Sequence, residues 1–208
     1  MRGAGAEATL TAPMADDTTE LLEDEAEIVE APALSDADRA RRDAALAHVR
    51  TFGDPVLRTE ARPVDRFDEE LIAEIRRMAV LMEDAFGIGL AATQIGVPHR
   101  VLVYRVEHDS PVNALVNPVL EWSSDEAEVM EEGCLSLPRV HVDVERPVHV
   151  RVSGVDEHGD ALTVEASGLE ARVIQHEIDH LDGVLILDRC PRDQRKEAIR
   201  TLREALDR

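Results

Sequence analysis

The chain has 208 residues, of which 44% are hydrophobic, enough for a domain to fold around its own core. Its formal net charge of −21 argues against broad binding to DNA or RNA, because contacts with phosphates need clustered Lys and Arg side chains. No apolar run approaches the roughly 20 residues that span a membrane, and the acidic amino terminus lacks the features of a signal or transit peptide. We therefore expect a soluble, cytoplasmic protein that binds neither membranes nor DNA.

Residues 1–45 are expected to be an acidic, disordered extension, followed by one folded domain over residues 46–208. The first 34 residues contain nine acidic residues, one basic residue (Arg2) and no aromatic residue. Such a segment buries too little apolar surface to offset the entropy that it would lose on ordering. The alternative interpretation is an acidic tail that binds a partner. Residues 35–50 could form a short helix.

Residues 66–86 are predicted to form a helix. Apolar side chains recur there every three or four residues, and acidic residues crowd the first turn. We expect this apolar face to be core rather than part of a cofactor site. Its residues are Leu71, Ile75, Met78, Met82 and Phe86.

The middle of the chain is predicted to form strands. Residues 101–106 and 113–122 are apolar runs, and Pro118 in the second marks an edge or a bulge. Residues 140–155 alternate between apolar and polar, as a half-buried antiparallel strand or hairpin does. Residues 161–166 form a further candidate strand.

Two helices are predicted after the strands. In the first, Ser167 and Glu170 have the spacing of a capping box, and Gly183 suits the position just past the end of the helix. The second covers residues 191–208. A helix, several strands and then two helices, without regular βαβ alternation, indicate an α+β fold.

The first of these helices contains the sequence QHEIDH, which has the H-E-x-x-H pattern of a helical metal site. His176 and His180 are four residues apart, so both imidazoles can reach one ion from the same helical face. Glu177 stands beside the first histidine, where its carboxylate can act on water as a general base. Two histidines do not complete a catalytic site, so a third ligand is needed.

The third ligand could come from three places in the chain. A metzincin protease would have a histidine where this chain has Ile186. A thermolysin-like site would take a downstream glutamate, and Glu197 and Glu204 lie in a charged helix without a matching motif. Cys134, in the segment EEGCLSLP, offers a thiolate and leaves a fourth position for water. The alternative role for Cys134 is that of a small buried hydrophobe, and Cys190 is expected to be structural.

The segment GIGLAATQIG, residues 87–96, partly matches a dinucleotide-binding fingerprint at Gly87, Gly89 and Ala92. That fingerprint must follow a strand, whereas this segment follows a predicted helix. We favour a glycine loop that brings backbone and Gln94 close to a reacting group.

Together, GIGLAATQ, EEGCLSLP and QHEIDH resemble the three motifs of the peptide deformylase family, in that family's order. The resemblance runs from about Thr51 to the carboxyl terminus. It implies a metallohydrolase that removes the formyl group from the N-terminal formyl-methionine of nascent bacterial polypeptides and releases formate. It also implies an α+β fold with antiparallel sheets around a central H-E-x-x-H helix, followed by a C-terminal helix.

The resemblance further implies the role of each site residue. One divalent ion would be held, most often Fe²⁺ in this family, with Ni²⁺, Co²⁺ or Zn²⁺ as alternatives. The metal ligands would be Cys134, His176 and His180; Glu177 would be the acid/base; and Gln94 with the backbone N–H of Leu135 would stabilise the oxyanion.

Around this centre, the resemblance implies substrate contacts and support for the cysteine loop. A tight backbone at Gly89 would exclude acyl groups larger than formyl, and Glu132 paired with Arg146 would lock the cysteine loop. Relatives carry Arg where this chain has His141, a position that contacts the peptide. The apolar pocket for the methionine side chain would be lined by Ile88, Leu169 and Val173.

The C-terminal helix, residues 191–208, carries six basic and four acidic residues in a strongly acidic chain. The resemblance implies that it helps to dock the enzyme near the ribosomal exit tunnel. Two other functions stay open at this point. One is a zinc endopeptidase, and the other is a non-catalytic, ribosome-associated homologue.

Overall fold

In this computed structural model, the described part of the chain comprises residues 34–107 and 109–206. Most of the expected acidic extension, residues 1–33, lies outside the described residues. The compact unit begins at Leu34. The short helix predicted within residues 35–50 is confirmed as α1 (Asp36–Leu46), whose Ala45 is buried in the core. The expectation of disorder was therefore wrong for residues 36–45.

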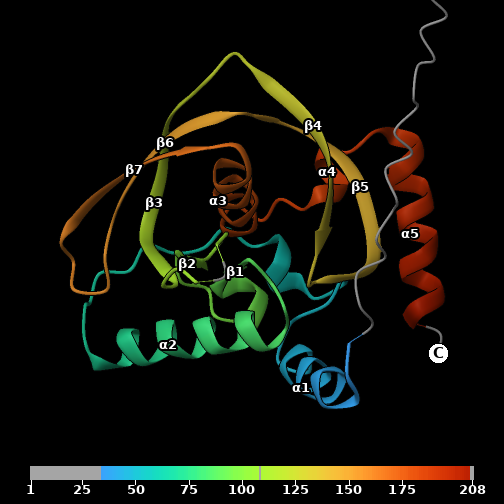
Figure 1. Cartoon of the computed structure of the whole chain (residues 1–208), viewed down its shortest axis with the longest axis horizontal. Helices are drawn as coiled ribbons and strands as arrows, with labels where there is room; N and C mark the ends of the chain where they lie inside the picture. Colours follow the sequence, from blue (N-terminus) through green and yellow to red (C-terminus); the bar gives the residue numbers. More distant parts are fainter. Residues whose placement is uncertain (1–33, 108, 207–208) are drawn as a thin grey trace, which may run out of the picture. The chain divides into compact units, whose positions relative to one another are not determined.

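Two antiparallel sheets enclose a central helix, as expected for the α+β class. The helix α3 (Gly168–Leu181) lies between the sheets in Figure 1. The smaller sheet pairs β4 (Ala127–Cys134) with β5 (Leu137–Pro147). The larger sheet has the order β1-β2-β3-β6-β7. Its strands are β1 (Gly89–Ala91), β2 (Val101–Tyr104), β3 (Asn113–Ser123), β6 (His149–Val155) and β7 (Ala161–Ser167).

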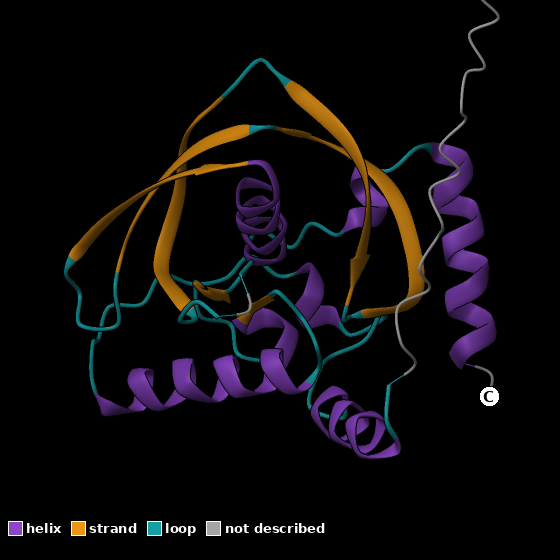
Figure 2. Ribbon diagram, viewed as in Figure 1, coloured by secondary structure: helices purple, strands orange, loops and turns teal. Residues whose placement is uncertain are grey.

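Two further helices cover the outer faces of the sheets (Figure 2), α2 (Glu69–Asp84) on the larger sheet and α5 (Arg192–Leu206) on the smaller. Among residues 34–107 and 109–206, none of the helices combines the length and the apolar sequence that a membrane span requires. In Figure 1, α2 runs below the larger sheet and α5 lies on the outer side of β5. The remaining elements are short: the helix α4 (Ile186–Arg189) and the 3₁₀ turns η1 (Pro55–Arg58) and η2 (Ala92–Ile95).

Strand β2 is buried on both faces, which explains its continuous apolar sequence. Val101 and Val103 pack in one core cluster with α2. Leu102 and Tyr104 pack in a second cluster with α3. The sheet thus holds α3 in a fixed position, and α3 carries the H-E-x-x-H pattern.

The helix predicted over residues 66–86 is confirmed as α2, but its expected core face was partly wrong. Asp68 caps the helix by accepting hydrogen bonds from the N–H groups of Glu70 and Leu71. Four of the five expected core residues are buried. Phe86 lies beyond the helix end with a positive φ of 57° and is 44% exposed. The reversed backbone turns its ring away from the apolar face of α2.

The predicted strands are confirmed, and Pro118 lies at a bulge where the register of β3 against β6 shifts. The hairpin interpretation of residues 140–155 was wrong. β5 pairs with β4 and β6 pairs with β3 and β7, so these two consecutive strands belong to different sheets. Only Val148 separates them, and the alternation of side chains cannot distinguish a hairpin from such a crossing.

The prediction for the first residue of α3 was wrong, whereas the prediction for its end is confirmed. The predicted capping box was wrong, because the Ser167 hydroxyl bonds Nδ1 of His149 at 2.8 Å and makes no cap hydrogen bond. Glu170 instead accepts a hydrogen bond from the Tyr104 hydroxyl at 3.1 Å. Gly183 does end the helix, with a φ of 71° and a 3.2 Å hydrogen bond from its N–H to the carbonyl of His180.

The C-terminal helix α5 packs on the smaller sheet. Ala198 and Leu202 are buried in a third core cluster together with residues of β5. The Leu206 side chain lies outside the described residues. Along the described part of α5, the basic side chains are exposed.

Candidate active site

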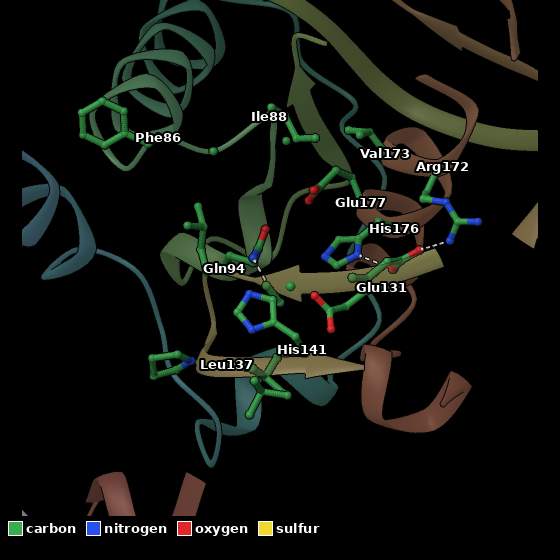
Figure 3. Close-up of a pocket in the computed structure, with 18 of the residues that line it drawn as sticks. Phe86, Ile88, Gln94, Glu131, Leu137, His141, Arg172, Val173, His176 and Glu177 are labelled. Carbon is green, nitrogen blue, oxygen red and sulfur yellow. Dashed lines mark hydrogen bonds and ion pairs between the residues drawn. The ribbon is translucent and has the colours of Figure 1, made fainter. Parts of the chain in front are cut away.

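The three motif segments meet around one cavity of about 450 Å³. Its walls come from the end of α1, the segment after α2, the β4–β5 sheet and α3. In Figure 3, Phe86 and Ile88 lie on one side of the cavity and His141 on the other. Gln94, His176 and Glu177 lie between them. Segments that are far apart in the sequence therefore build one site.

Cys134, His176 and His180 form a group that can hold a metal ion. Their ligand atoms all lie within 4.8 Å of one another, and Cys134 Sγ is 3.2 Å from His180 Nε2. Ligands about 2.0–2.3 Å from one ion lie about 3–4 Å apart, so this cluster has suitable dimensions. Cys134 ends β4, and the two histidines lie one turn apart on α3. A thiolate and two imidazoles leave a fourth position of a tetrahedral ion open.

The protein groups shift the pKa values of the two histidines in opposite directions. Burial lowers the pKa of His176, but contacts with Cys134 and Glu132 outweigh it and raise the pKa to about 10. Burial and the neighbouring His176 push the pKa of His180 well below its usual value. Because a metal ion binds neutral imidazole and thiolate, its binding would displace the proton that this group otherwise holds.

Glu177 lies beside the metal-binding group with its carboxylate buried. Burial raises its pKa to about 7, although the positive charges of His176 and Arg146 oppose the shift. Its Oε2 atom is buried and accepts no hydrogen bond within the described part of the chain. A buried carboxylate oxygen with a near-neutral pKa can both take up and release a proton.

Gly89 makes room for the Glu177 carboxylate. A Cβ atom at position 89 would overlap Oε1 of Glu177 and approach Val173 Cγ1 to 2.9 Å. The site therefore requires a residue without a side chain on β1. The glycine also leaves the β1 backbone open to whatever occupies the cavity.

Gln94 lies on the turn η2 with its side-chain amide held in one orientation. Its Oε1 accepts a hydrogen bond from the N–H of Ala91 at 2.8 Å. The amide nitrogen therefore faces the cysteine loop, 3.2 Å from Ser136 Oγ and 3.7 Å from Cys134 Sγ. Leu135, the next residue after Cys134, also lines the cavity.

Glu132 and Arg146 form a buried ion pair behind the cysteine loop. Arg146 donates to both oxygens of Glu132, at 2.6 and 2.9 Å, and each side chain is less than 10% exposed. His176 Nδ1 lies 3.0 Å from Glu132 Oε2. Burial raises the pKa of Glu132, but hydrogen bonds from His176 and Arg146 hold it well below its usual value. The carboxylate is therefore ionised and links β4 to the metal-binding helix.

Three members of this network, Arg172, Asp179 and Arg189, were not predicted from the sequence. Arg172 donates to Glu132 Oε1 at 2.7 Å and to the carbonyl of Val144 at 2.9 Å. Asp179 Oδ2 accepts from Arg146 at 2.8 Å and from Arg189 Nε at 3.0 Å. Two of them could have been found from the sequence. Arg172 and Asp179 interrupt the apolar residues of α3, a helix that is buried on most faces, and buried charged side chains need partners.

The expected methionine pocket residues all line the cavity. Val173 is buried, whereas Ile88 and Leu169 are 44% and 46% exposed and form its apolar rim. Phe86 and Met130, which the sequence analysis did not assign to the site, add to this surface. His141 also lines the cavity, from β5.

The other ligand candidates lie elsewhere. Ile186 is buried in the core cluster beneath β5, and Glu197 is on α5. Neither they nor Glu204 belong to a potential metal-binding group among the described residues. Cys190 is a free cysteine, as is Cys134.

Comparisons with known proteins agree on one family. A family model described as polypeptide deformylase matches residues 46–196. The peptide deformylase of Parafrankia sp. is 48% identical over 157 residues, covering 76% of this chain and 85% of the relative. That of Acidothermus cellulolyticus is 49% identical over 161 residues, covering 77% and 88%.

Solved structures agree with this result. The peptide deformylase of Synechococcus elongatus, in complex with actinonin, superposes with a TM-score of 0.71 at 44% identity, covering 74% of this chain and 85% of that one. The peptide deformylase of Legionella pneumophila gives a TM-score of 0.73 at 37% identity, covering 76% and 94%.

Proposed function

Because the chain belongs to the peptide deformylase family and removes the formyl group from N-terminal formyl-methionine, we propose that the groups around Cys134, His176 and His180 carry out this hydrolysis. The supporting observation is the position of Glu177. Its buried carboxylate oxygen, which has no hydrogen-bond partner among the described residues, stands beside a thiolate–imidazole group that fits one metal ion. The alternative functions, an endopeptidase or a non-catalytic homologue, have no support in the comparisons.

The protein is a metalloenzyme, and we propose that Cys134, His176 and His180 hold its metal. A divalent ion bound there supplies Lewis-acid chemistry, which lowers the pKa of water and polarises a carbonyl. We propose Fe²⁺ as the native ion, in line with the family resemblance. Ni²⁺, Co²⁺ and Zn²⁺ suit the same mixture of nitrogen and sulfur ligands.

Glu177 is proposed as the general base and then the general acid. Its carboxylate takes a proton from the water whose oxygen attacks the formyl carbon. When the carbon–nitrogen bond breaks, Glu177 returns that proton to the amine nitrogen. The products are formate and a free methionine amino group. Burial of Glu177 raises its pKa and so favours a carboxyl group that can both accept and return a proton.

Gln94 and the backbone N–H of Leu135 are proposed to stabilise the oxyanion. The Gln94 amide is already oriented by its hydrogen bond from Ala91. It therefore needs little reorganisation when charge develops on the formyl oxygen. Losing one such donor typically costs about 10²–10³ in rate.

The methionine side chain is proposed to lie against Ile88, Leu169 and Val173. Their apolar surface at the rim of the cavity suits a flexible thioether. The backbone of β1 at Gly89 is proposed to border the formyl group closely and so to exclude larger acyl groups. Glu132 and Arg146 are proposed to hold the cysteine loop in place.

The substrates are nascent polypeptides, and we propose that the enzyme meets them in the cytoplasm as they leave the ribosome. The exposed basic residues of α5 are proposed to bind ribosomal RNA near the exit tunnel. Ala198 and Leu202 support this arrangement, because they fix the opposite side of α5 to the domain.

The proposed function is tested by the release of formate from formyl-Met-Ala. Protein purified without oxygen should release formate and should leave unformylated peptides uncut. Metal analysis of the same sample should give one ion per chain. Cleavage of internal peptide bonds without release of formate would instead support an endopeptidase.

A further inference from the structure

Helix α1 lies almost entirely before the segment that the family model matches, residues 46–196. It contributes two residues to the wall of the cavity: Leu46, the first residue of that segment, and Arg42, which lies before it. The substrate cleft of this chain is therefore lined in part by a residue, Arg42, that the family segment does not include.

The end of α1 is held firmly at this position. Ala45 is 4% exposed and packs in the same core cluster as α2. The guanidinium carbon of Arg41 lies 4.8 Å from the centre of the Phe86 ring, and its Nε is 3.8 Å from Asp84. In Figure 3, the blue ribbon of α1 lies on the Phe86 side of the cavity. Arg42 thus projects from a supported helix.

Arg42 differs from the buried arginine of the same cavity. Arg172 is buried and bonded to Glu132. Arg42 is exposed and forms no ion pair with the residues at 34–107 and 109–206. On the β5 wall, Arg139 is likewise exposed and unpaired within that part of the chain. Glu131 is the exposed carboxylate that lines the same cavity.

The mouth of the cleft therefore carries a small excess of positive charge in a chain whose net charge is −21. Formyl-methionine is uncharged, so these cations cannot form an ion pair with the reacting end. A guanidinium favours a carboxylate, which it can bind through two parallel hydrogen bonds. The part of the substrate that can supply a carboxylate is the peptide that follows the methionine.

We propose that Arg42 is a specificity-determining residue that binds a carboxylate in the peptide downstream of the formyl-methionine. This inference rests on the proposed function. The enzyme then deformylates chains with an acidic residue in one of the next two positions faster than chains with a basic residue there. The carboxylate comes from a side chain in a nascent polypeptide, and in a short peptide it can also come from the carboxyl terminus.

The experiment compares kcat/KM for formate release from C-terminally amidated formyl-peptides. The first set is formyl-Met-X-Ala-amide and the second is formyl-Met-Ala-X-amide, with Asp, Ala or Lys at X. One further peptide, formyl-Met-Ala-Ala with a free carboxyl terminus, separates a terminal carboxylate from a side chain. Wild type is compared with Arg42→Glu, Arg42→Ala and Arg42→Lys. The control, Arg77→Glu, reverses an exposed arginine on α2 that does not line the cavity.

Wild type should prefer Asp to Lys by roughly three- to tenfold in one of the two sets, mainly through KM. Arg42→Ala should bring that ratio near one, Arg42→Glu should invert it, and Arg42→Lys should keep most of it. Arg77→Glu should leave it unchanged. Raising the salt concentration should shrink the wild-type ratio.

If the ratio of kcat/KM for the Asp peptide to that for the Lys peptide were equal in wild type, Arg42→Ala and Arg42→Glu, this inference would be overturned. A preference that appears only with the free carboxyl terminus would also reject its application to nascent chains. If wild-type protein released formate from none of the peptides, the proposed function itself would fail instead.

Discussion

The imidazole Nδ1 of His176 lies 3.0 Å from Oε2 of Glu132, which is ionised and buried. Because a carboxylate only accepts hydrogen bonds, Nδ1 must carry the proton. Nε2 of His176 is therefore the nitrogen that can bind a metal, once the metal has displaced its proton. The same carboxylate binds two arginines, so the orientation of the histidine depends on a wider buried network.

Glu132→Gln should therefore weaken metal binding by about 10–100-fold. The neutral amide keeps the shape of the side chain but loses the charge that orders Arg146 and Arg172. The measurement is competition for the metal against a chelator of known affinity. The control, Glu145→Gln, removes an exposed charge on the neighbouring strand β5. Equal metal affinity in both variants would contradict the supporting role of Glu132.

Glu177→Gln should keep the metal and lower kcat by at least about 10²-fold. The amide has the same shape, but it cannot take a proton from water. Metal content and formate release are measured on the same sample. Near-normal turnover at full metal occupancy would show that another group is the acid/base.

Gly89→Ala should reduce activity by displacing Glu177, because the new Cβ overlaps its carboxylate and crowds Val173. Overpacking of this kind also lowers the free energy of unfolding, by about 1–3 kcal/mol. Metal content should change little, since the atoms nearest to the new Cβ belong to Glu177 and Val173 and not to the three ligands. If activity and thermal stability both stayed at the wild-type level, the tight fit at this position would be refuted.

The sequence predicted the site better than the path of the strands around it. The H-E-x-x-H spacing is a local property of one helix, so His176 and His180 could be placed side by side from sequence. At Val148 the chain passes from one sheet to the other, because β5 pairs with β4 whereas β6 pairs with β3 and β7. The alternation of apolar and polar residues does not indicate which strands pair. The buried contacts of Arg172 and Asp179 likewise form only after β4, β5 and α3 have packed.

Local pattern also failed where the backbone leaves its regular path. Phe86 fits the apolar spacing of α2, but the helix ends before it and the positive φ turns it toward the cleft. Arg42 belongs to residues 35–50, which could be predicted as a short helix but were placed in part within the expected disordered extension 1–45. Its place in the cavity wall depends on Ala45 packing against α2.

Asp188 provides a test of stability against pH. It accepts hydrogen bonds from Arg58 and, at 2.9 Å, from the N–H of Leu185. Burial raises the pKa of Asp188, but these two donors outweigh it and lower the pKa. The unfolded chain therefore takes up this proton first as the pH falls. The stabilisation is complete above about pH 4 and is lost as the pH drops through the lower pKa of the folded state.

Asp188→Asn should therefore lower the free energy of unfolding by about 1 kcal/mol at pH 7. The difference from wild type should shrink as the pH falls below about 4. Urea unfolding of both proteins at a series of pH values measures this difference in the free energy of unfolding. Asp65→Asn, at an exposed position without an ion pair in the described chain, is the control and should show no such dependence. A difference independent of pH would rule out the charge as its cause.

Ribosome binding through α5 should be tested by charge reversal rather than by truncation. Removing the helix would expose the core that Ala198 and Leu202 cover, so loss of binding would not separate charge from folding. Lys196 and Arg203 are exposed on α5 and have no carboxylate partner among the described residues. The double variant Lys196→Glu/Arg203→Glu should therefore keep its fold and its activity on free formyl-peptides.

The same variant should co-sediment with bacterial ribosomes several-fold less than wild type at low salt, and the wild-type signal should fall as salt rises. The matched control is Arg76→Glu/Arg77→Glu, which makes the same change in net charge on exposed residues of α2. If both double variants lost binding equally, net charge alone would explain the result and α5 would have no specific role. Unchanged binding of the α5 variant would reject docking through this helix.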